Sequence, residues 1–264
     1  MVSGEVMSCL LSYQENAMNR LNRICDFRSL RVLEIGGSPP GWEVGREFLR
    51  RGADTVICIN NREDVRSEMI HERLEVHRMD ARAIDLASES FDIVFGTAVL
   101  EHLQDLDLVL KEIGRVLKRN GIVYLHGGPI WSCCLGHHLW VFTDEVFYKF
   151  NDSNNPIPNW YHLILSGSEM RALLLRKKLS NSHANQIVEM IYDSDLINRY
   201  IYEDYIRILS GANLLIVRLL ENCWGTPDPD VMKMLHKSGR DVNGNYHTGA
   251  VDVIMEKSKR GLIR

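Results

Sequence analysis

Five short apolar runs rich in β-branched residues constrain the fold of this chain more than any other feature. They are RVLEI (31–35), TVICI (55–59), LEVHRM (74–79), FDIVF (91–95) and GIVYLH (121–126). Helical patterns separate the first two runs and the last two. Strands that alternate with helices in this way build a mostly parallel sheet with helices on both faces. The sequence therefore predicts an α/β fold.

The regions around these runs carry helical and strand patterns of their own. Apolar residues from Val6 to Ile24 follow steps of three and four, which predicts an amphipathic helix over 5–25. Three further helices are expected over 168–179, 183–193 and 195–210. Two further strands are expected over 212–222 and 247–258, with a proline-initiated helix over 227–239 between them.

Composition limits the class of protein. With 264 residues and 45% hydrophobic content, the chain can bury one substantial core. A net charge of -4 gives no basis for binding nucleic acid. The sequence has no signal-peptide pattern, no apolar run of the roughly 18 residues that a membrane span needs, and six cysteines without a C-x-x-C pair. We therefore expect a soluble, cytoplasmic protein with reduced thiols that binds neither nucleic acid nor membrane.

The loop after the first predicted strand, LEIGGSPPGWEVG (33–45), looks like a nucleotide-binding loop whose later glycines are replaced. A loop that cradles phosphate needs free backbone N–H groups, and Pro39 and Pro40 have none. Gly36 and Gly37 still allow a ligand to approach the backbone closely. The prolines therefore argue against a dinucleotide such as NAD.

Five motifs follow one another along the chain. They are LEIGG, ICINN, MDARAIDLASESFD, GTAVLEHLQD and LKEIGRVLKRNGIVYL, in that order. In order and spacing this series resembles the class I S-adenosylmethionine-dependent methyltransferases, of the type 11 kind, over roughly residues 30–130. The resemblance implies a Rossmann-like fold with a seven-strand, mostly parallel sheet and a helical lid between the fifth and sixth strands. It also implies S-adenosyl-L-methionine as cofactor, which contains no phosphate.

On this basis we expect a single methyltransferase domain over 1–264. Its parts are an N-terminal helix (1–29), a cofactor-binding core (30–130), a helical lid or acceptor region (131–211) and C-terminal strands (212–264).

The resemblance also assigns cofactor-binding residues to the carboxyl ends of the strands. Glu34 with Gly36 would line the methionine and ribose end, and Thr97 would lie under the sulfonium. Asn60 stands where the family more often has Asp or Glu for the ribose hydroxyls, and an amide accepts one hydrogen bond and donates one. The full set that the resemblance implies is Glu34, Gly36, Gly37, Ser38, Asn60, Asp80, Ala81 and Thr97, with Asp80 and Ala81 at the adenine.

The stretch HGGPIWSCCLGHHLW (126–140) follows the fifth strand, so we expect it to overhang the reactive end of the cofactor. His137 or His138 would accept a proton from the acceptor or bind it, since neutral imidazole suits that task; a purely structural role is equally open. Trp131, Trp140 and Tyr161 would form the acceptor pocket.

We expect no metal here, because two adjacent pairs, Cys133 with Cys134 and His137 with His138, rarely converge on one tetrahedral ion. Glu101 and His102 look like an acid/base pair, but packing and helix capping explain them better.

The favoured function is methyl transfer from S-adenosylmethionine to a small-molecule acceptor. One alternative is a different reaction at the same cofactor, cyclisation or alkyl transfer, because a fold does not fix a reaction. Another is a non-catalytic cofactor-binding subunit with a structural or regulatory role.

Overall fold

The computed structural model describes residues 10–39 and 41–257, and its centre is one eight-stranded sheet in the order β3-β4-β2-β1-β5-β6-β10-β9. Five strands run parallel: β1 (Arg31–Ile35), β2 (Thr55–Asn60), β4 (Leu74–Arg78), β5 (Phe91–Gly96) and β6 (Leu117–Gly127). The other three pair antiparallel: β3 (Glu68–His71), β9 (Leu215–Cys223) and β10 (Thr248–Glu256). The predicted mostly parallel sheet is thus confirmed.

The expected count of seven strands was one too low. The additional strand is β3, which pairs with β4 at the edge of the sheet. Three of its four residues are exposed, so it has no buried apolar face that would distinguish it from a loop in the sequence.

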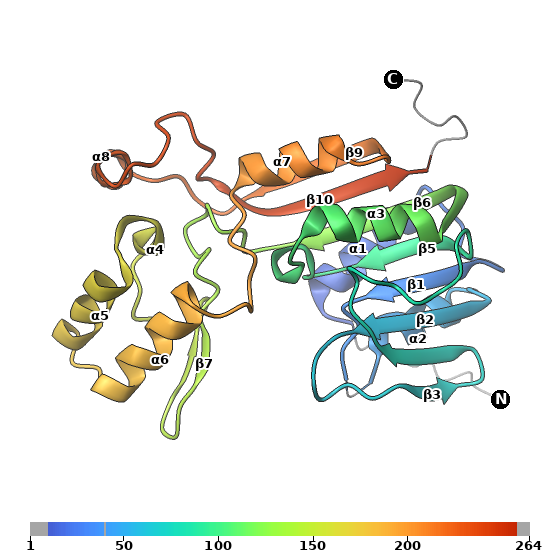
Figure 1. Ribbon diagram of the computed structural model, residues 1–264, viewed down its shortest axis with the longest axis horizontal. Coiled ribbons are helices and arrows are strands. Elements are labelled where there is room, and N and C mark those ends of the chain that lie inside the picture. The colour runs from blue at the N-terminus through green and yellow to red at the C-terminus, as the bar shows by residue number, and fades with distance from the viewer. Residues whose placement is uncertain (1–9, 40, 258–264) are drawn as a thin grey trace, which may run out of the picture.

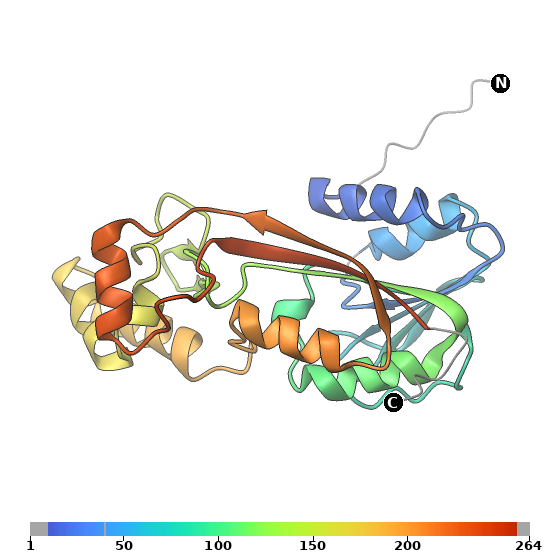
Figure 2. The same ribbon diagram turned by 90° about the horizontal axis from the view of Figure 1, so that it is seen from above.

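Helices cover both faces of the sheet (Figure 2). On one face lie α1 (Ser12–Asn22) and α2 (Glu43–Arg50), and on the other lie α3 (Leu106–Val116) and α7 (Tyr202–Gly211). The predicted helix over 5–25 is shorter, beginning at Ser12, and its residues 5–9 lie outside the described residues. The predicted helix over 195–210 begins only at Tyr202. None of the helices in the described ranges is long and apolar enough to cross a membrane.

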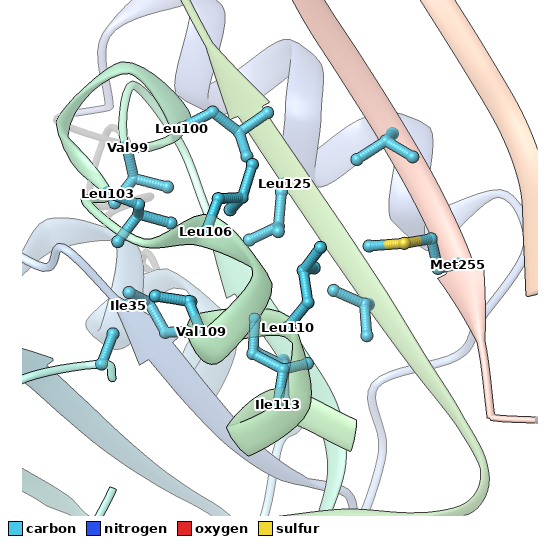
Figure 3. Packing of buried hydrophobic residues seen from close by; sticks show 14 of the residues in the cluster. Ile35, Val99, Leu100, Leu103, Leu106, Val109, Leu110, Ile113, Leu125 and Met255 are labelled. Atoms are coloured by element: carbon cyan, nitrogen blue, oxygen red, sulfur yellow. The ribbon is translucent and has the colours of Figure 1, made fainter. Parts of the chain in front are cut away.

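Two buried clusters hold these layers together. On the α3 side, Leu106, Val109, Leu110 and Ile113 repeat at helical spacing and pack against the sheet (Figure 3). On the α1 and α2 side, the aromatic rings of Phe27, Phe48, Phe95 and Tyr124 contact one another in this order, with centroids 4.9 to 5.3 Å apart. Central strands such as β1 and β5 are therefore buried on both faces, as their β-branched sequences predict.

The expected helical lid is instead a lobe that lies beyond the end of the sheet (Figure 1). Its buried cluster includes Trp131, Leu139, Ile187 and Leu235. The lobe contains a hairpin and four helices: β7 (Trp140–Phe142), β8 (Phe147–Lys149), α4 (Tyr161–Ile164), α5 (Gly167–Arg176), α6 (Asn181–Tyr192) and α8 (Pro229–Lys237). The sequence missed the hairpin, because its strands have only three residues each.

Three of the lobe helices begin at capping residues that the sequence marks. Ser166 accepts a hydrogen bond from the Glu169 backbone at the start of α5, and Ser180 does the same for His183 at the start of α6. Asp228 caps α8, with Pro229 as the first helical residue. These local signals fix where the lobe helices start.

Candidate functional site

The loop after β1 depends on Gly36. This residue has φ 84°, its N–H donates to the Ile59 carbonyl at 2.9 Å, and an added Cβ would lie 2.8 Å from Cγ2 of Val99. Both the left-handed conformation and the close contact exclude a side chain. The loop therefore presents bare backbone at the carboxyl end of β1, where open α/β sheets bind ligands.

Asn60, at the end of β2, fixes this loop from the neighbouring strand. Its Nδ2 donates to the Gly37 carbonyl at 2.9 Å, and its Oδ1 accepts from the Arg62 N–H at 3.0 Å. A carboxylate could not donate the first of these hydrogen bonds. The departure from the acidic residue of the family pattern thus has a structural reason, because the amide connects β2 to the glycine loop.

Glu34 lies beneath the loop rather than on its surface. Glu34 is 5% exposed, and its Oε2 accepts from Cys58 Sγ at 2.9 Å. Burial raises the pKa of Glu34 to about 7, and hydrogen bonds from Cys58 and the Gly45 backbone oppose that rise. The carboxyl group supports the loop from below, 3.0 Å from where a Cβ of Gly37 would lie.

Asp80 follows β4 and is engaged by a neighbour. Arg82 forms an ion pair with it at 2.7 Å and a second one with Asp105 at 2.9 Å. The hydrogen bonds from Arg82 hold the pKa of Asp80 below its usual value, so the carboxylate is charged. Ala81 next to it is buried in the core, and Ser38 on the first loop is exposed.

We expect Asp80→Ala to weaken binding of S-adenosylhomocysteine about tenfold to a hundredfold, because it removes a charged hydrogen-bond acceptor worth about 1.5–3 kcal/mol. Calorimetry on the folded variant measures this. Asp105→Ala is the matched control, since it removes the other partner of Arg82 and should leave the affinity unchanged. Equal affinities for both variants and the unaltered chain would contradict the assignment of Asp80.

The turn after β5 is fixed to the end of β6. Thr97 begins this turn, and the N–H of Ala98 donates to His126 Nδ1 at 3.1 Å. The His126 ring stacks against Tyr13 of α1 with centroids 5.9 Å apart. Tyr13 and His126 therefore border the edge from the α1 side, and neither residue belongs to the site that the sequence predicts.

A buried polar cluster lies past this turn. Glu101 and His102 belong to the short 3-10 helix η1 (Leu100–His102), and His138 comes from the loop after β6. One ligand atom from each lies within 4.8 Å of the others, and the rings of His102 and His138 are 5.0 Å apart. Burial raises the pKa of Glu101 and lowers that of His138 to about 3. His138 is thus neutral and a weak proton acceptor near pH 7.

His137 has different surroundings from His138. It is fully buried, its Nδ1 accepts from the Leu139 N–H at 3.1 Å, and its ring packs on His162 with centroids 5.5 Å apart. His162 Nε2 in turn donates to the Trp131 carbonyl at 2.8 Å. These contacts favour the structural alternative for His137, in which the side chain stabilises its own loop and takes no part in the reaction.

We therefore expect His137→Ala to lower the free energy of unfolding by about 1–3 kcal/mol, because it leaves the buried Leu139 N–H without an acceptor. Urea denaturation measures the loss, and cofactor affinity should persist. His236→Ala, on the exposed side of α8, is the control and should change stability little. Unchanged stability of His137→Ala together with reduced turnover would favour the catalytic alternative.

The residues predicted for the acceptor lie in the lobe. Trp131 is nearly buried, with its ring 4.7 Å from His162 and 5.8 Å from the Arg199 guanidinium. Trp140 is half exposed on β7, where it packs on Phe147. Tyr161 begins α4. Within the described ranges, no hydrogen bond or ring contact connects these three to the glycine loop.

The structure thus brings part of the predicted cofactor set together. Gly36, Gly37 and Asn60 are in direct contact, with Glu34 below them, and Asp80 follows the adjacent strand.

Cys133 and Cys134 are buried side by side in the lobe loop, and burial raises the pKa of Cys133.

Comparison with known proteins fits this geometry. Residues 41–125 match the family model described as a methyltransferase domain. A sterol 24-C-methyltransferase of Clavispora lusitaniae is 24% identical over 176 residues, which cover 64% of this chain and 42% of that protein. A ubiquinone biosynthesis O-methyltransferase of Pelagibacter ubique is 22% identical over 102 residues, 37% of this chain and 42% of that protein. The matches thus span less than half the length of these curated relatives.

The fold itself is similar to that of solved methyltransferases. An S-adenosylmethionine dependent methyltransferase from Mesorhizobium loti superposes with a TM-score of 0.51 at 11% identity, covering 91% of this chain and 97% of that one. The predicted Rossmann-like methyltransferase fold is thus confirmed.

Proposed function

Because the chain belongs to the class I S-adenosylmethionine-dependent methyltransferases, we propose that it transfers a methyl group from S-adenosylmethionine to a small-molecule acceptor. The observation that carries this proposal is the carboxyl edge of β1, β2 and β4. It offers bare backbone at Gly36, an amide at Asn60 and a carboxylate at Asp80. The relatives named for sterol and ubiquinone methylation support a small-molecule acceptor.

The residues present fit the cofactor. Gly36 has φ 84° and a Cβ there would collide with Val99, so only glycine gives the loop this bare-backbone conformation at the carboxyl end of β1. Asp80 would accept from the adenine amino group, while Thr97 with Ser38 would border the methionine end. Pro39 removes an N–H that a diphosphate would need and that a sulfonium nucleoside does not.

When bound, S-adenosylmethionine supplies a methyl group on an already activated sulfonium. The protein therefore has to hold the acceptor atom in line with that methyl group and exclude water. We assign this positioning to the border formed by Tyr13, His126 and the cluster of Glu101, His102 and His138. Trp131, Trp140 and Tyr161 are proposed contacts on the lobe side for an acceptor that reaches past this border.

Mass spectrometry of reaction products tests the proposal. The purified full chain is incubated with S-adenosylmethionine and a panel of phenolic, sterol and amine acceptors. We expect S-adenosylhomocysteine together with an acceptor that is heavier by one methylene unit. A rearranged or alkyl-transferred product without S-adenosylhomocysteine would indicate the alternative chemistry. Cofactor binding without any product across the panel would favour a non-catalytic subunit.

A further inference from the structure

The cluster of Glu101, His102 and His138 contains buried atoms without partners. Glu101 is 2% exposed, and among the described residues neither of its carboxylate oxygens has a hydrogen-bond partner of good geometry. The backbones of Glu101 and Gly128 lower its pKa by less than burial raises it. His138 is 9% exposed, and its Nδ1 likewise has no hydrogen-bond partner within the ranges that the structure describes. A buried carboxylate without a partner is costly, and such groups are normally paired or bind a metal. One ligand atom from each of the three residues lies within 4.8 Å of the others, which points to a ligand between them.

The two imidazoles are arranged so that each leaves a lone pair for that ligand. His102 Nδ1 lies 2.6 Å from the Leu196 carbonyl, and a carbonyl can only accept, so Nδ1 carries the proton and Nε2 is free. The backbone of Pro129 forms a hydrogen bond with the His138 ring, which leaves Nδ1 as the nitrogen without a partner. Histidines that bind metals usually donate their second N–H to a backbone carbonyl or carboxylate in this way.

We propose that Glu101, His102 and His138 bind one divalent transition metal ion, for which Zn²⁺ is the best match. One carboxylate and two imidazoles form a common zinc ligand set. Three protein ligands leave a fourth position open, as catalytic zinc sites do. This set shares only His138 with the Cys133, Cys134, His137 and His138 loop, for which the sequence predicts no metal.

The distances allow such a site with small movements. Zinc binds nitrogen and oxygen at about 2.0–2.2 Å, so its ligand atoms lie about 3.3 Å apart in a tetrahedron. His102 Nε2 is 3.9 Å from Glu101 Oε1, and the three ligand atoms lie within 4.8 Å of one another. Gly127 makes room for the carboxylate, since a Cβ there would lie 2.5 Å from Glu101 Oε2.

The open coordination position of the proposed metal site lies close to the proposed sulfonium site. Glu101 follows the turn that begins at Thr97, which is the turn proposed to lie under the sulfonium. A hydroxyl or carbonyl oxygen of an acceptor could occupy the fourth position and be held by the ion. This use rests on the proposed methyl transfer, whereas metal binding itself does not.

Titration of the chelator-treated, dialysed full chain with ZnCl₂ in a calorimeter tests the proposal, with CoCl₂ as a spectroscopic probe. We expect about one ion per chain and visible absorption bands of cobalt with nitrogen and oxygen ligands. Glu101→Gln and His138→Gln should each weaken binding at least about tenfold to a hundredfold. His183→Gln is the matched control, because His183 is a buried histidine of the lobe that bonds to Tyr148 instead.

Several results would overturn the proposal. They are no saturable binding of either ion by the unaltered chain, binding that both cluster variants retain, and cobalt bands typical of thiolate ligands, which would move the ion to Cys133 and Cys134. Melting curves identify a variant that fails to fold, and the remaining variant with the cobalt spectrum then decides. No arm of this test uses S-adenosylmethionine, so its failure is distinguishable from failure of the proposed function.

Discussion

Gly36→Val should weaken binding of S-adenosylhomocysteine by about a hundredfold, or roughly 3 kcal/mol. Gly36 has φ 84°, which a β-branched residue adopts only with strain, and its Cβ would lie 2.8 Å from Cγ2 of Val99. The collision with Val99 would displace the loop backbone that the ligand is proposed to approach. Calorimetric titration of the folded variant gives the affinity, and thermal melting gives an expected loss of about 1–3 kcal/mol in stability.

Gly114→Ala is the control for this substitution. Gly114 lies within α3, and an added Cβ would meet nothing within 4 Å. Alanine there should raise stability by about 0.5–1 kcal/mol and leave the affinity unchanged. If folded Gly36→Val binds the sulfur ligand as tightly as the unaltered chain, the glycine loop is not the cofactor site.

Glu34→Gln should remove a pH-dependent loss of stability of about 3 kcal/mol. Burial raises the pKa of Glu34 from 4.5 to about 7 in the folded chain, so the folded state binds this proton more tightly than the unfolded state. Stability from this group is therefore fully present below pH 4.5 and falls as the pH rises to about 7. Glutamine keeps an acceptor for Cys58 and does not titrate.

The measurement is the difference in unfolding free energy between variant and unaltered chain, taken by urea denaturation at pH 4 and pH 8. This difference should move by about 3 kcal/mol in favour of the variant on going to pH 8. Glu72→Gln, an exposed position, should show no such trend. A difference that stays constant with pH would mean that Glu34 is not buried as the structure has it.

The sequence predicts the parallel core well, because the physical signal there is local and strong. Strands such as β1 and β5 are β-branched runs buried on both faces, and they lie where the pattern places them. β3 and the hairpin of β7 and β8 were missed, since three- and four-residue strands carry too little periodicity. The sequence predicts a purely helical lid in place of this lobe, because the short hairpin has no recognisable strand pattern. In addition, helix α8 packs into the lobe although it lies far along the chain from the other lobe elements.

The candidate site is predictable in part. Motif order places Gly36, Asn60 and Asp80 along one edge, since the carboxyl ends of parallel strands meet there. Two contacts of this edge are not readable from spacing, because the hydrogen bond from Asn60 to the Gly37 carbonyl and the ion pair of Arg82 with Asp105 each join residues 23 positions apart. The same holds for Glu101 and His138, which are 37 positions apart and meet only because η1 faces the loop after β6.

Calorimetric titration of the full chain with S-adenosylhomocysteine and, separately, with NAD tests the central claim most directly. The sulfur nucleoside needs the bare backbone at Gly36, whereas the diphosphate of NAD needs N–H groups that Pro39 lacks. We expect saturable binding of S-adenosylhomocysteine at about one molecule per chain and no binding heat with NAD. Saturable binding of NAD, with no response to either S-adenosylhomocysteine or S-adenosylmethionine, would contradict the account.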